Sequence, residues 1–202
     1  MTHKLSAVLI SGRPQTAKSR PGLLDFGGAK VVERTVSAYG DFAQVVLVVA
    51  GDAEGFPKGS NVTVVTVAED AVVAKQIQAG LDAMDKGNDG FCTGLIDQPL
   101  LTAELVNGMA GAFLGGSDKI LVPLALRQIG QPAFFRKELA SEFAKLADGE
   151  TAWSILKNHG DDVAIYDTNE TSVLRNIEDM DDYHAMLQIA GHPVPVAAED
   201  AD

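Results

Sequence analysis

The stretch LIDQPL, residues 95–100, marks the point where an interior strand gives way to a connection. Residues 91–96 are an apolar run, which predicts a buried strand, and Pro99 cannot donate to a sheet ladder. Open α/β folds bind ligands at the carboxyl ends of their strands. Asp97 is therefore a candidate ligand-binding residue, and its carboxylate suits Mg²⁺ beside a nucleotide. The alternative is a solvated turn residue or a helix cap.

Apolar strands alternate with helical patterns along most of the chain. Strands separated by helices indicate βαβ units, and valine-rich strands without polar alternation suit a sheet covered on both faces. We therefore expect an α/β fold with a mostly parallel central sheet. Strands are predicted at Leu5–Ile10, Gln44–Val49, Val62–Val67, Phe91–Ile96, Ile120–Val122 and Val163–Tyr166, with a turn leading into another at 130–135. Helices are predicted at Lys30–Tyr39, Ala71–Met84, Thr102–Phe113, Lys137–Leu146, Thr151–Asn158 and Asp179–Ala190.

The loop after the first strand, residues 11–28, carries glycines and the cations Lys18 and Arg20. Backbone donors in such a loop can hold phosphates, and glycine permits close approach. Right-handed crossovers would place this loop and Asp97 at the same edge of the sheet. The two segments are therefore predicted to form one site.

Composition limits the classes of function. The 202 residues carry a net charge of −12, which argues against a nucleic-acid partner. The single cysteine, Cys92, excludes an intrachain disulfide framework. We find no signal segment and no apolar run of membrane-spanning length, so a cytoplasmic protein without a membrane partner is expected. One domain is predicted over 1–190, followed by an acidic, disordered tail at 191–202.

Four ordered motifs together resemble the MobA-like nucleotidyltransferase superfamily, and most closely its molybdenum cofactor cytidylyltransferase type. The family signature LAAGxSxRMGxxK, followed by a leucine run and GG, is matched in part by LISG at 9–12 and LLDFGG at 23–28. The family's GDQPL is similar to IDQPL at 96–100, and its GHP motif to GQPAFF at 130–135. Its closing DIDTPEDY is similar to NIEDMDDY at 176–183. The resemblance spans nearly everything from Ala7 to Leu187.

The resemblance implies a three-layer Rossmann-like nucleotidyltransferase fold and transfer of a nucleotidyl group from a nucleoside triphosphate, with CTP favoured. The acceptor would be molybdopterin cofactor, pyrophosphate would leave, and the protein partner would be a molybdoenzyme or its maturation factor. Asp97 and Glu178 would hold Mg²⁺, and Lys18, Arg20 and Asp97 would be catalytic. Gln98 and Gln131 would bind the acceptor substrate. Residues implied in nucleotide binding are Leu9, Ser11, Gly12, Arg13, Lys18 and Arg20.

The chain departs from the family pattern at several of these positions. The signature loop is degenerate, because Thr16, Lys18 and Pro21 stand where the family has Arg, Gly and Lys. Gln131 replaces the His of the GHP motif, and Trp153 stands where an Arg is expected. In the segment that faces the base, at 72–77, the family's Gly and Ser are absent. The sequence therefore leaves the base preference, the acceptor and the oligomeric state open.

Two alternatives follow from these departures. The chain can be a catalytically impaired relative that serves as a nucleotide- or cofactor-binding module, or a transferase acting on another phosphorylated metabolite. Other chemistry-bearing residues have simpler interpretations. Trp153 is interpreted as a packing residue, His159 as part of a helix C-terminus, and the Glu69-Asp70 pair as a charged helix start.

Overall fold

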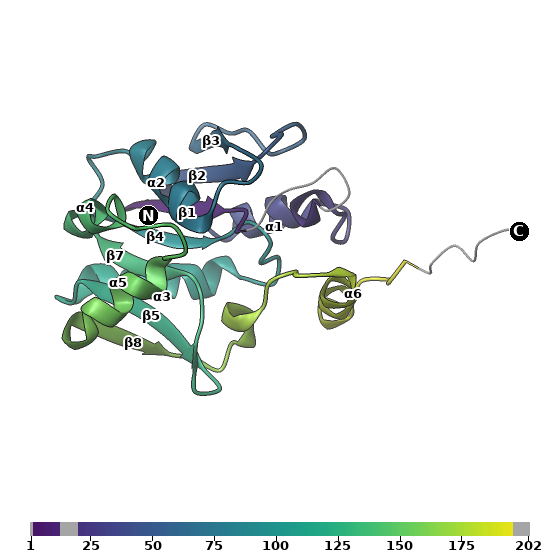
Figure 1. Cartoon of the computed structure of the whole chain (residues 1–202). Helices are drawn as coiled ribbons and strands as arrows, with labels where there is room; N and C mark the ends of the chain where they lie inside the picture. Colours follow the sequence, from purple (N-terminus) through teal and green to yellow (C-terminus); the bar gives the residue numbers. More distant parts are fainter. Residues whose placement is uncertain (1, 13–19, 196–202) are drawn as a thin grey trace, which may run out of the picture.

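The computed structural model of the protein describes residues 2–12 and 20–195, which form a three-layer α/β domain (Figure 1). Arg13 and Lys18, both predicted to bind nucleotide, lie outside the described residues. The strands of the described part are β1 His3–Ile10, β2 Phe42–Ala50, β3 Val62–Val67, β4 Gly90–Leu95, β5 Ile120–Ala125, β6 Gln128–Ile129, β7 Ala133–Arg136 and β8 Val163–Asp167.

Helices connect these strands, as the sequence pattern predicts. The α-helices of the described part are α1 Val31–Ser37, α2 Val73–Asp82, α3 Ala103–Gly115, α4 Ala140–Phe143, α5 Ala152–Asn158 and α6 Met180–Ile189. Short 3₁₀ helices are η1 Pro21–Leu23, η2 Lys137–Leu139, η3 Gly160–Asp162 and η4 Thr171–Leu174. Thr102 caps α3 by accepting a hydrogen bond from the Leu105 amide.

The described strands form an eight-stranded sheet in the order β3-β2-β1-β4-β7-β5-β6, with β8 paired to β5. The α/β fold class is confirmed, and most of the described strands run parallel as predicted, while β6 and β7 run in the opposite direction and make the sheet mixed. β3, β2, β1 and β4 run parallel, whereas β7 pairs antiparallel with both β4 and β5. β7 enters the sheet directly from the turn at Pro132 without a crossover helix, and a strand without a crossover pairs antiparallel.

Both faces of the sheet are buried, which explains the unbroken apolar strands. In β1, Leu5, Ala7 and Leu9 point into the layer that contains α1 and α3. Val8 and Ile10 point into the opposite layer, which contains α2, α4 and α5. Figure 1 is viewed from the side of α2, α4 and α5. Two of these helices, α2 and α5, contribute residues beside the carboxyl ends of β1 and β4.

The edge position predicted for Asp97 follows from the register of β1 and β4. The two strands are parallel neighbours, with Ile10 opposite Leu95 at their carboxyl ends. The Ile96 amide continues the ladder and donates a 3.0 Å hydrogen bond to the Ile10 carbonyl. The loops that follow the two strands therefore leave the same edge side by side, as predicted.

The segment after β5 differs from the prediction. β5 extends to Ala125 and turns through Leu126 and Arg127 into the two-residue strand β6. Both turn residues have positive φ, 49° and 64°. This hairpin was missed because Leu and Arg are not residues that favour that backbone conformation. The helix predicted at 137–146 is also shorter, since α4 ends at Phe143.

The C-terminal part of the described chain packs beside the loop between η1 and α1. Tyr183, Met186 and Leu187 of α6 form an apolar cluster with Phe26 and others. The first residues of the predicted tail remain against this cluster, because the His192 ring lies edge-on to Phe26 at 5.4 Å. No helix within residues 2–12 and 20–195 is long and apolar enough to cross a membrane.

Helix α2 packs closely against the sheet through Gly80, which makes this glycine a sensitive test of the layer arrangement. A Cβ at Gly80 would lie 2.4 Å from Val8 Cγ1 and 2.9 Å from Val48 Cγ2. We expect Gly80→Ala to lower the free energy of unfolding by about 1–3 kcal/mol through overpacking. The matched control is Gly111→Ala in α3, where nothing lies within 4 Å of the added Cβ. It should raise stability by about 0.5–1 kcal/mol. Urea unfolding measures both, and a Gly80→Ala protein as stable as Gly111→Ala would contradict the packing.

Candidate functional site

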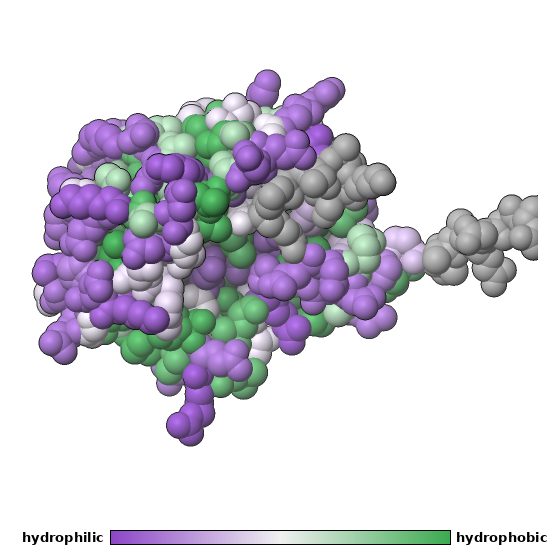
Figure 2. Space-filling model, in the orientation of Figure 1, coloured by the Kyte–Doolittle hydropathy of each residue, from purple (hydrophilic) through white to green (hydrophobic). Residues whose placement is uncertain are grey.

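A cavity of about 530 Å³ opens at the carboxyl ends of β1 and β4. Figure 2 shows this face of the molecule, with both hydrophobic and hydrophilic surface around its central hollow. The cavity lies where α/β folds bind ligands. The residues that line it are Ile10, Ser11, Gly12, Val73, Ile77, Thr93, Gly94, Leu95, Asp97, Ile129, Gly130, Gln131, Ala133, Thr151, Ala152, Trp153, Leu156, Asn176 and Glu178.

The two predicted metal carboxylates, Asp97 and Glu178, line the same cavity although 80 residues separate them in the chain. Asp97 is 2% exposed, and its carbonyl accepts a 3.1 Å hydrogen bond from the Ile177 amide. This bond draws the segment before α6 to the end of β4. The Glu178 amide donates to Asp182 Oδ2 at 2.9 Å, which anchors Glu178 at the start of α6. The site thus presents one buried and one exposed carboxylate.

Two carboxylates with hard oxygen atoms fit Mg²⁺ or Mn²⁺ when nucleotide phosphates and water complete the coordination. Among the described residues no cluster of three or more His, Cys, Asp or Glu side chains could hold a metal by itself. The arrangement therefore suits a cation that arrives with a nucleotide better than an all-protein metal cage.

Ser11 and Gly12 begin the predicted phosphate loop, and both are held by Gln76 of α2. Gln76 Oε1 accepts from Ser11 Oγ and from the Gly12 amide, each at 3.0 Å. Ser11 Oγ in turn accepts from the Ala50 amide at 3.2 Å, and Gln76 Nε2 donates to the Ala71 carbonyl at 2.8 Å. Gly12 has φ +73°, which suits glycine. The start of the loop is thus tied to two neighbouring elements.

Sequence reasoning missed Gln76 as a site residue. Gln76 is fully buried, and a polar side chain at that depth needs hydrogen-bond partners, which Ser11, Gly12 and Ala71 provide. The available signal was a glutamine within the apolar stripe of the helix, at the position where the family has Ser. Its two acceptor contacts depend on the packing of α2 over β1 and could not be read from spacing.

Gln131 lines the cavity from the turn between β6 and β7, as its predicted contact with the acceptor requires. Its amide donates a 2.8 Å hydrogen bond to the Val173 carbonyl. The neighbouring Gly130 packs so tightly that a Cβ would lie 2.4 Å from the same carbonyl oxygen. The Gln131 side chain is therefore presented by a firmly held backbone.

The structure does not bring three other predicted residues to the cavity wall. Leu9 is fully buried in the core, and Gln98 is 2% exposed, with its side chain between the Leu95 amide and the Arg175 carbonyl. Arg20 pairs with the Asp52 carboxylate at 3.5 Å and donates to backbone carbonyls of the β2–β3 loop. Within the described residues, its side-chain contacts are with that loop.

Trp153 differs from its interpretation as a packing residue. The side chain is 48% exposed and lines the cavity from the first turn of α5. Thr151 caps this helix by accepting from the Trp153 amide at 3.2 Å. The packing interpretation failed because Ile155 and Leu156 form the buried side of the helix and leave Trp153 at its rim.

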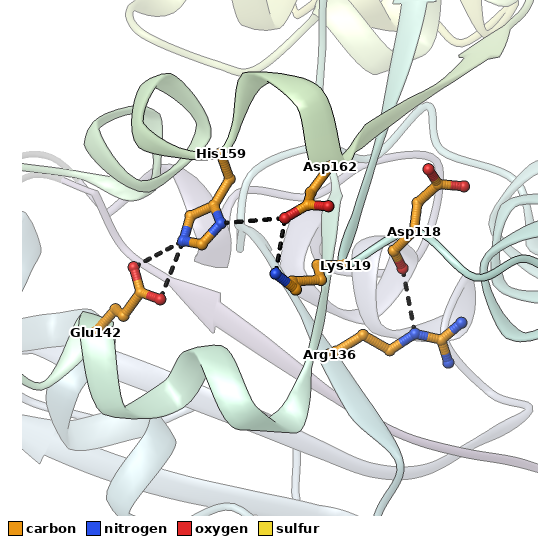
Figure 3. Close-up of polar contacts among 6 residues, drawn as sticks. All are labelled: Asp118, Lys119, Arg136, Glu142, His159 and Asp162. Carbon is orange, nitrogen blue, oxygen red and sulfur yellow. Dashed lines mark hydrogen bonds and ion pairs between the residues drawn. The ribbon is translucent and has the colours of Figure 1, made fainter.

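A charged network holds α5 against its neighbours (Figure 3). His159, at the end of α5, places Nε2 2.8 Å from Glu142 Oε2 of α4. Its Nδ1 lies 3.7 Å from Asp162 Oδ2, which accepts from Lys119 Nζ at 2.7 Å. The network therefore connects α4 and α5 to the starts of β5 and β8. It also gives His159 partners beyond the helix C-terminus predicted from the sequence.

This network predicts a pH dependence of stability. The Lys119 hydrogen bond lowers the pKa of Asp162 below its ordinary 3.8, with His159 adding to the effect. The folded protein therefore binds fewer protons here than the unfolded chain, so the stabilisation is present above pH 3.8 and is lost as the pH falls through the lower folded pKa. We expect Asp162→Asn to lower the urea midpoint at pH 7. At a pH well below 3.8, the midpoints of Asp162→Asn and wild type should be equal. The neighbouring Asp161→Asn is the control, and a constant difference between Asp162→Asn and wild type across this range would contradict the assignment.

Comparison with solved structures places the fold among known nucleotidyltransferases. A homologue of Mycobacterium tuberculosis Rv0371c from Mycobacterium sp. strain JC1 is 19% identical, with TM-score 0.81 over 95% of this chain and 98% of that chain. Rv0371c from M. tuberculosis H37Rv, in complex with manganese, is 19% identical, with TM-score 0.77 over 93% and 100%. The 2-C-methyl-D-erythritol 4-phosphate cytidylyltransferase from Thermus thermophilus is 19% identical, with TM-score 0.72 over 95% and 100%.

Comparison with curated protein sequences gives no significant match. A family model does match, over residues 7–163, and this range includes the second half of β1, all of β4 and the segments that follow both strands. The matched range covers most of the chain, and the three-layer Rossmann-like fold agrees with it. The chain therefore belongs to the family of the MobA-like NTP transferase domain.

Proposed function

We propose that the protein transfers CMP from CTP to the phosphate of molybdopterin cofactor, with a divalent metal ion, Mg²⁺ in the cell, bound alongside the nucleotide. The observation that carries the proposal is the meeting of Asp97 and Glu178 in one cavity with Ser11 and Gly12. These residues come from three of the ordered motifs that resemble the cytidylyltransferase type. The setting proposed for this reaction is the cytoplasm, with a molybdoenzyme or its maturation factor receiving the product.

In the proposed reaction a phosphate oxygen of the acceptor attacks the α-phosphorus of CTP. The bond from the α-phosphorus to the oxygen that bridges to the β-phosphorus breaks, and that oxygen leaves with pyrophosphate. A dianionic acceptor phosphate carries no proton to remove, so the charges balance without a general base. Such a step depends on in-line positioning and charge stabilisation more than on a protein nucleophile.

Residues of the cavity supply these two requirements. Asp97 and Glu178 would hold the metal ion, which neutralises charge on the phosphates when bound. The Ser11–Gly12 turn, fixed by Gln76, would present the start of the phosphate loop to the nucleotide. Gln131 offers an amide that can donate to the acceptor from the opposite side of β4.

A second candidate function is that of a nucleotide- or cofactor-binding module without turnover. It is favoured by one observation: among the described residues, the cavity wall holds no Lys or Arg. Arg20, a predicted phosphate ligand, pairs with Asp52 instead. Phosphoryl transfer without a cation on the triphosphate loses a large part of its charge stabilisation.

Pyrophosphate release separates the two candidates. CTP, GTP, ATP and UTP are each incubated with the protein, Mg²⁺ and molybdopterin cofactor, with parallel reactions containing a sugar phosphate as acceptor. Release that requires CTP, Mg²⁺ and the cofactor together supports the proposal. Release only with the sugar phosphate would favour a transferase for another phosphorylated metabolite, and nucleotide binding without any release would favour the binding module.

A further inference from the structure

We infer that Trp153 is a specificity-determining residue, which stacks on a planar heterocycle of the acceptor and selects acceptors that carry such a heterocycle over sugar phosphates. The inference rests on the proposed function and extends it to the acceptor half of the cavity. It starts from an exposed aromatic side chain that the fold places on the cavity wall.

The sheet order divides the cavity into two halves on either side of β4. On the β1 side lie Ser11 and Gly12, with α2 packed over β1 and β2. On the β7 side lie Gln131 and the residues of α5 that face the cavity, including Trp153. Because the proposed phosphate loop begins with Ser11 and Gly12 on the β1 side, we assign the β7 side to the acceptor.

The acceptor half is apolar and aromatic. Trp153 is accompanied on this wall by Ile129, which is 40% exposed, and by Leu156 and Ala152. An exposed tryptophan with apolar neighbours offers a flat surface for a heterocycle, and such rings stack on aromatic side chains. A sugar has no comparable flat π face.

The charges on the described wall of this half agree with that assignment. Its polar groups are the side chains of Gln131, Thr151 and Asn176, and the nearest charged groups are the carboxylates Asp97 and Glu178. The discrimination between acceptors therefore rests on the stacking surface of Trp153, because both kinds of acceptor carry a phosphate.

Trp153 lies on a helix that is fixed at both ends. The Thr151 cap fixes the first turn of α5, and the His159 contacts with Glu142 and Asp162 fix the other end. The side chain can therefore be replaced without removing a core residue, so a variant at this position reports on binding rather than on folding.

The test uses the fact that Trp153 is the only tryptophan in the chain. Binding of pterin-6-carboxylate, a planar heterocycle, is followed by tryptophan fluorescence and by calorimetry, with ribose 5-phosphate as the non-aromatic probe. Wild-type protein should show quenching and saturable binding with the pterin but not with ribose 5-phosphate. Trp153→Ala should weaken pterin binding about 5- to 100-fold, and Trp153→Phe should retain most of it.

The matched control is Ile165→Ala on β8, a large hydrophobic residue that is 49% exposed and lies outside the cavity wall. Its affinity for the pterin should equal that of wild type. The inference is overturned if wild-type protein does not bind the pterin, if Trp153→Ala binds it as tightly as wild type, or if ribose 5-phosphate binds equally well.

CTP titrations of the same variants separate this inference from the proposed function. Trp153-dependent pterin binding without CTP binding would uphold the stacking role and refute the transferase. Normal CTP binding and turnover with unchanged pterin affinity in Trp153→Ala would uphold the transferase and refute the stacking role. A loss of CTP affinity in Trp153→Ala, with pterin affinity unchanged, would assign Trp153 to the nucleotide base and overturn its role toward the acceptor.

Discussion

Asp97→Asn is expected to reduce Mg²⁺-dependent pyrophosphate release by about 100- to 1,000-fold, the range seen when one group that stabilises developing charge is removed. The substitution keeps the shape of a side chain that is 2% exposed but removes its negative charge. The Ile177–Asp97 backbone hydrogen bond does not involve the side chain and should persist. Steady-state kinetics with CTP and saturating Mg²⁺ measures the effect.

Glu178→Gln is the comparison for Asp97→Asn, because it removes a carboxylate from the exposed side of the same cavity. A smaller loss that excess Mg²⁺ partly restores is expected, since an exposed ligand is replaced more readily by water. Thermal unfolding of both variants checks that the fold is intact. Unchanged turnover in a folded Asp97→Asn protein would remove Asp97 from the metal site.

Gln76→Leu is expected to lower kcat/KM for CTP about 10- to 100-fold and to destabilise the protein by about 1–3 kcal/mol. The stability loss arises because the Ser11 hydroxyl and the Gly12 amide would lose their shared acceptor in a buried place. The loss of activity arises because the start of the phosphate loop is no longer fixed, and a shift of about 1 Å near reacting groups can cost about 100-fold.

Gln78→Leu, in the same helix, provides a matched control for Gln76→Leu. The Gln78 amide donates to the Phe143 and Leu146 carbonyls, away from the cavity wall. It should cost stability without a comparable loss in kcat/KM. Equal kinetic effects of the two substitutions would show that Gln76 acts only through stability. Gln76→Glu, which keeps an acceptor oxygen, should recover part of the activity lost in Gln76→Leu.

The sequence was most informative where residue pattern and topology agree. Asp97 was located at a strand end because the run at 91–96 is apolar and because Pro99 has no backbone N–H to donate to a sheet ladder. Parallel pairing predicted that the residues after the first strand lie at the same sheet edge as Asp97, and the register of Ile10 with Leu95 confirms this shared edge. Glu178 was located by its place in a motif rather than by physical reasoning, because long-range contacts such as the Ile177–Asp97 backbone hydrogen bond leave no local signal in the sequence.

Other features depend on tertiary contacts that sequence patterns do not contain. The antiparallel insertion of β7 between β4 and β5 is not visible in the sequence, because four residues give no signal of strand direction. The role of Gln76 appears only when α2 lies over β1. Trp153 was misinterpreted because one aromatic residue in a short amphipathic helix looks the same whether it faces the core or a cavity rim.

We propose that the edge after β1 and β4 binds a nucleotide together with a divalent metal through Asp97. The decisive experiment is calorimetric titration of CTP into wild-type and Asp97→Asn protein, with and without Mg²⁺. We expect saturable binding to wild type that tightens when Mg²⁺ is present, and no Mg²⁺ enhancement in Asp97→Asn. Absence of CTP binding to wild type, or an equal Mg²⁺ enhancement in both proteins, would refute the proposed site.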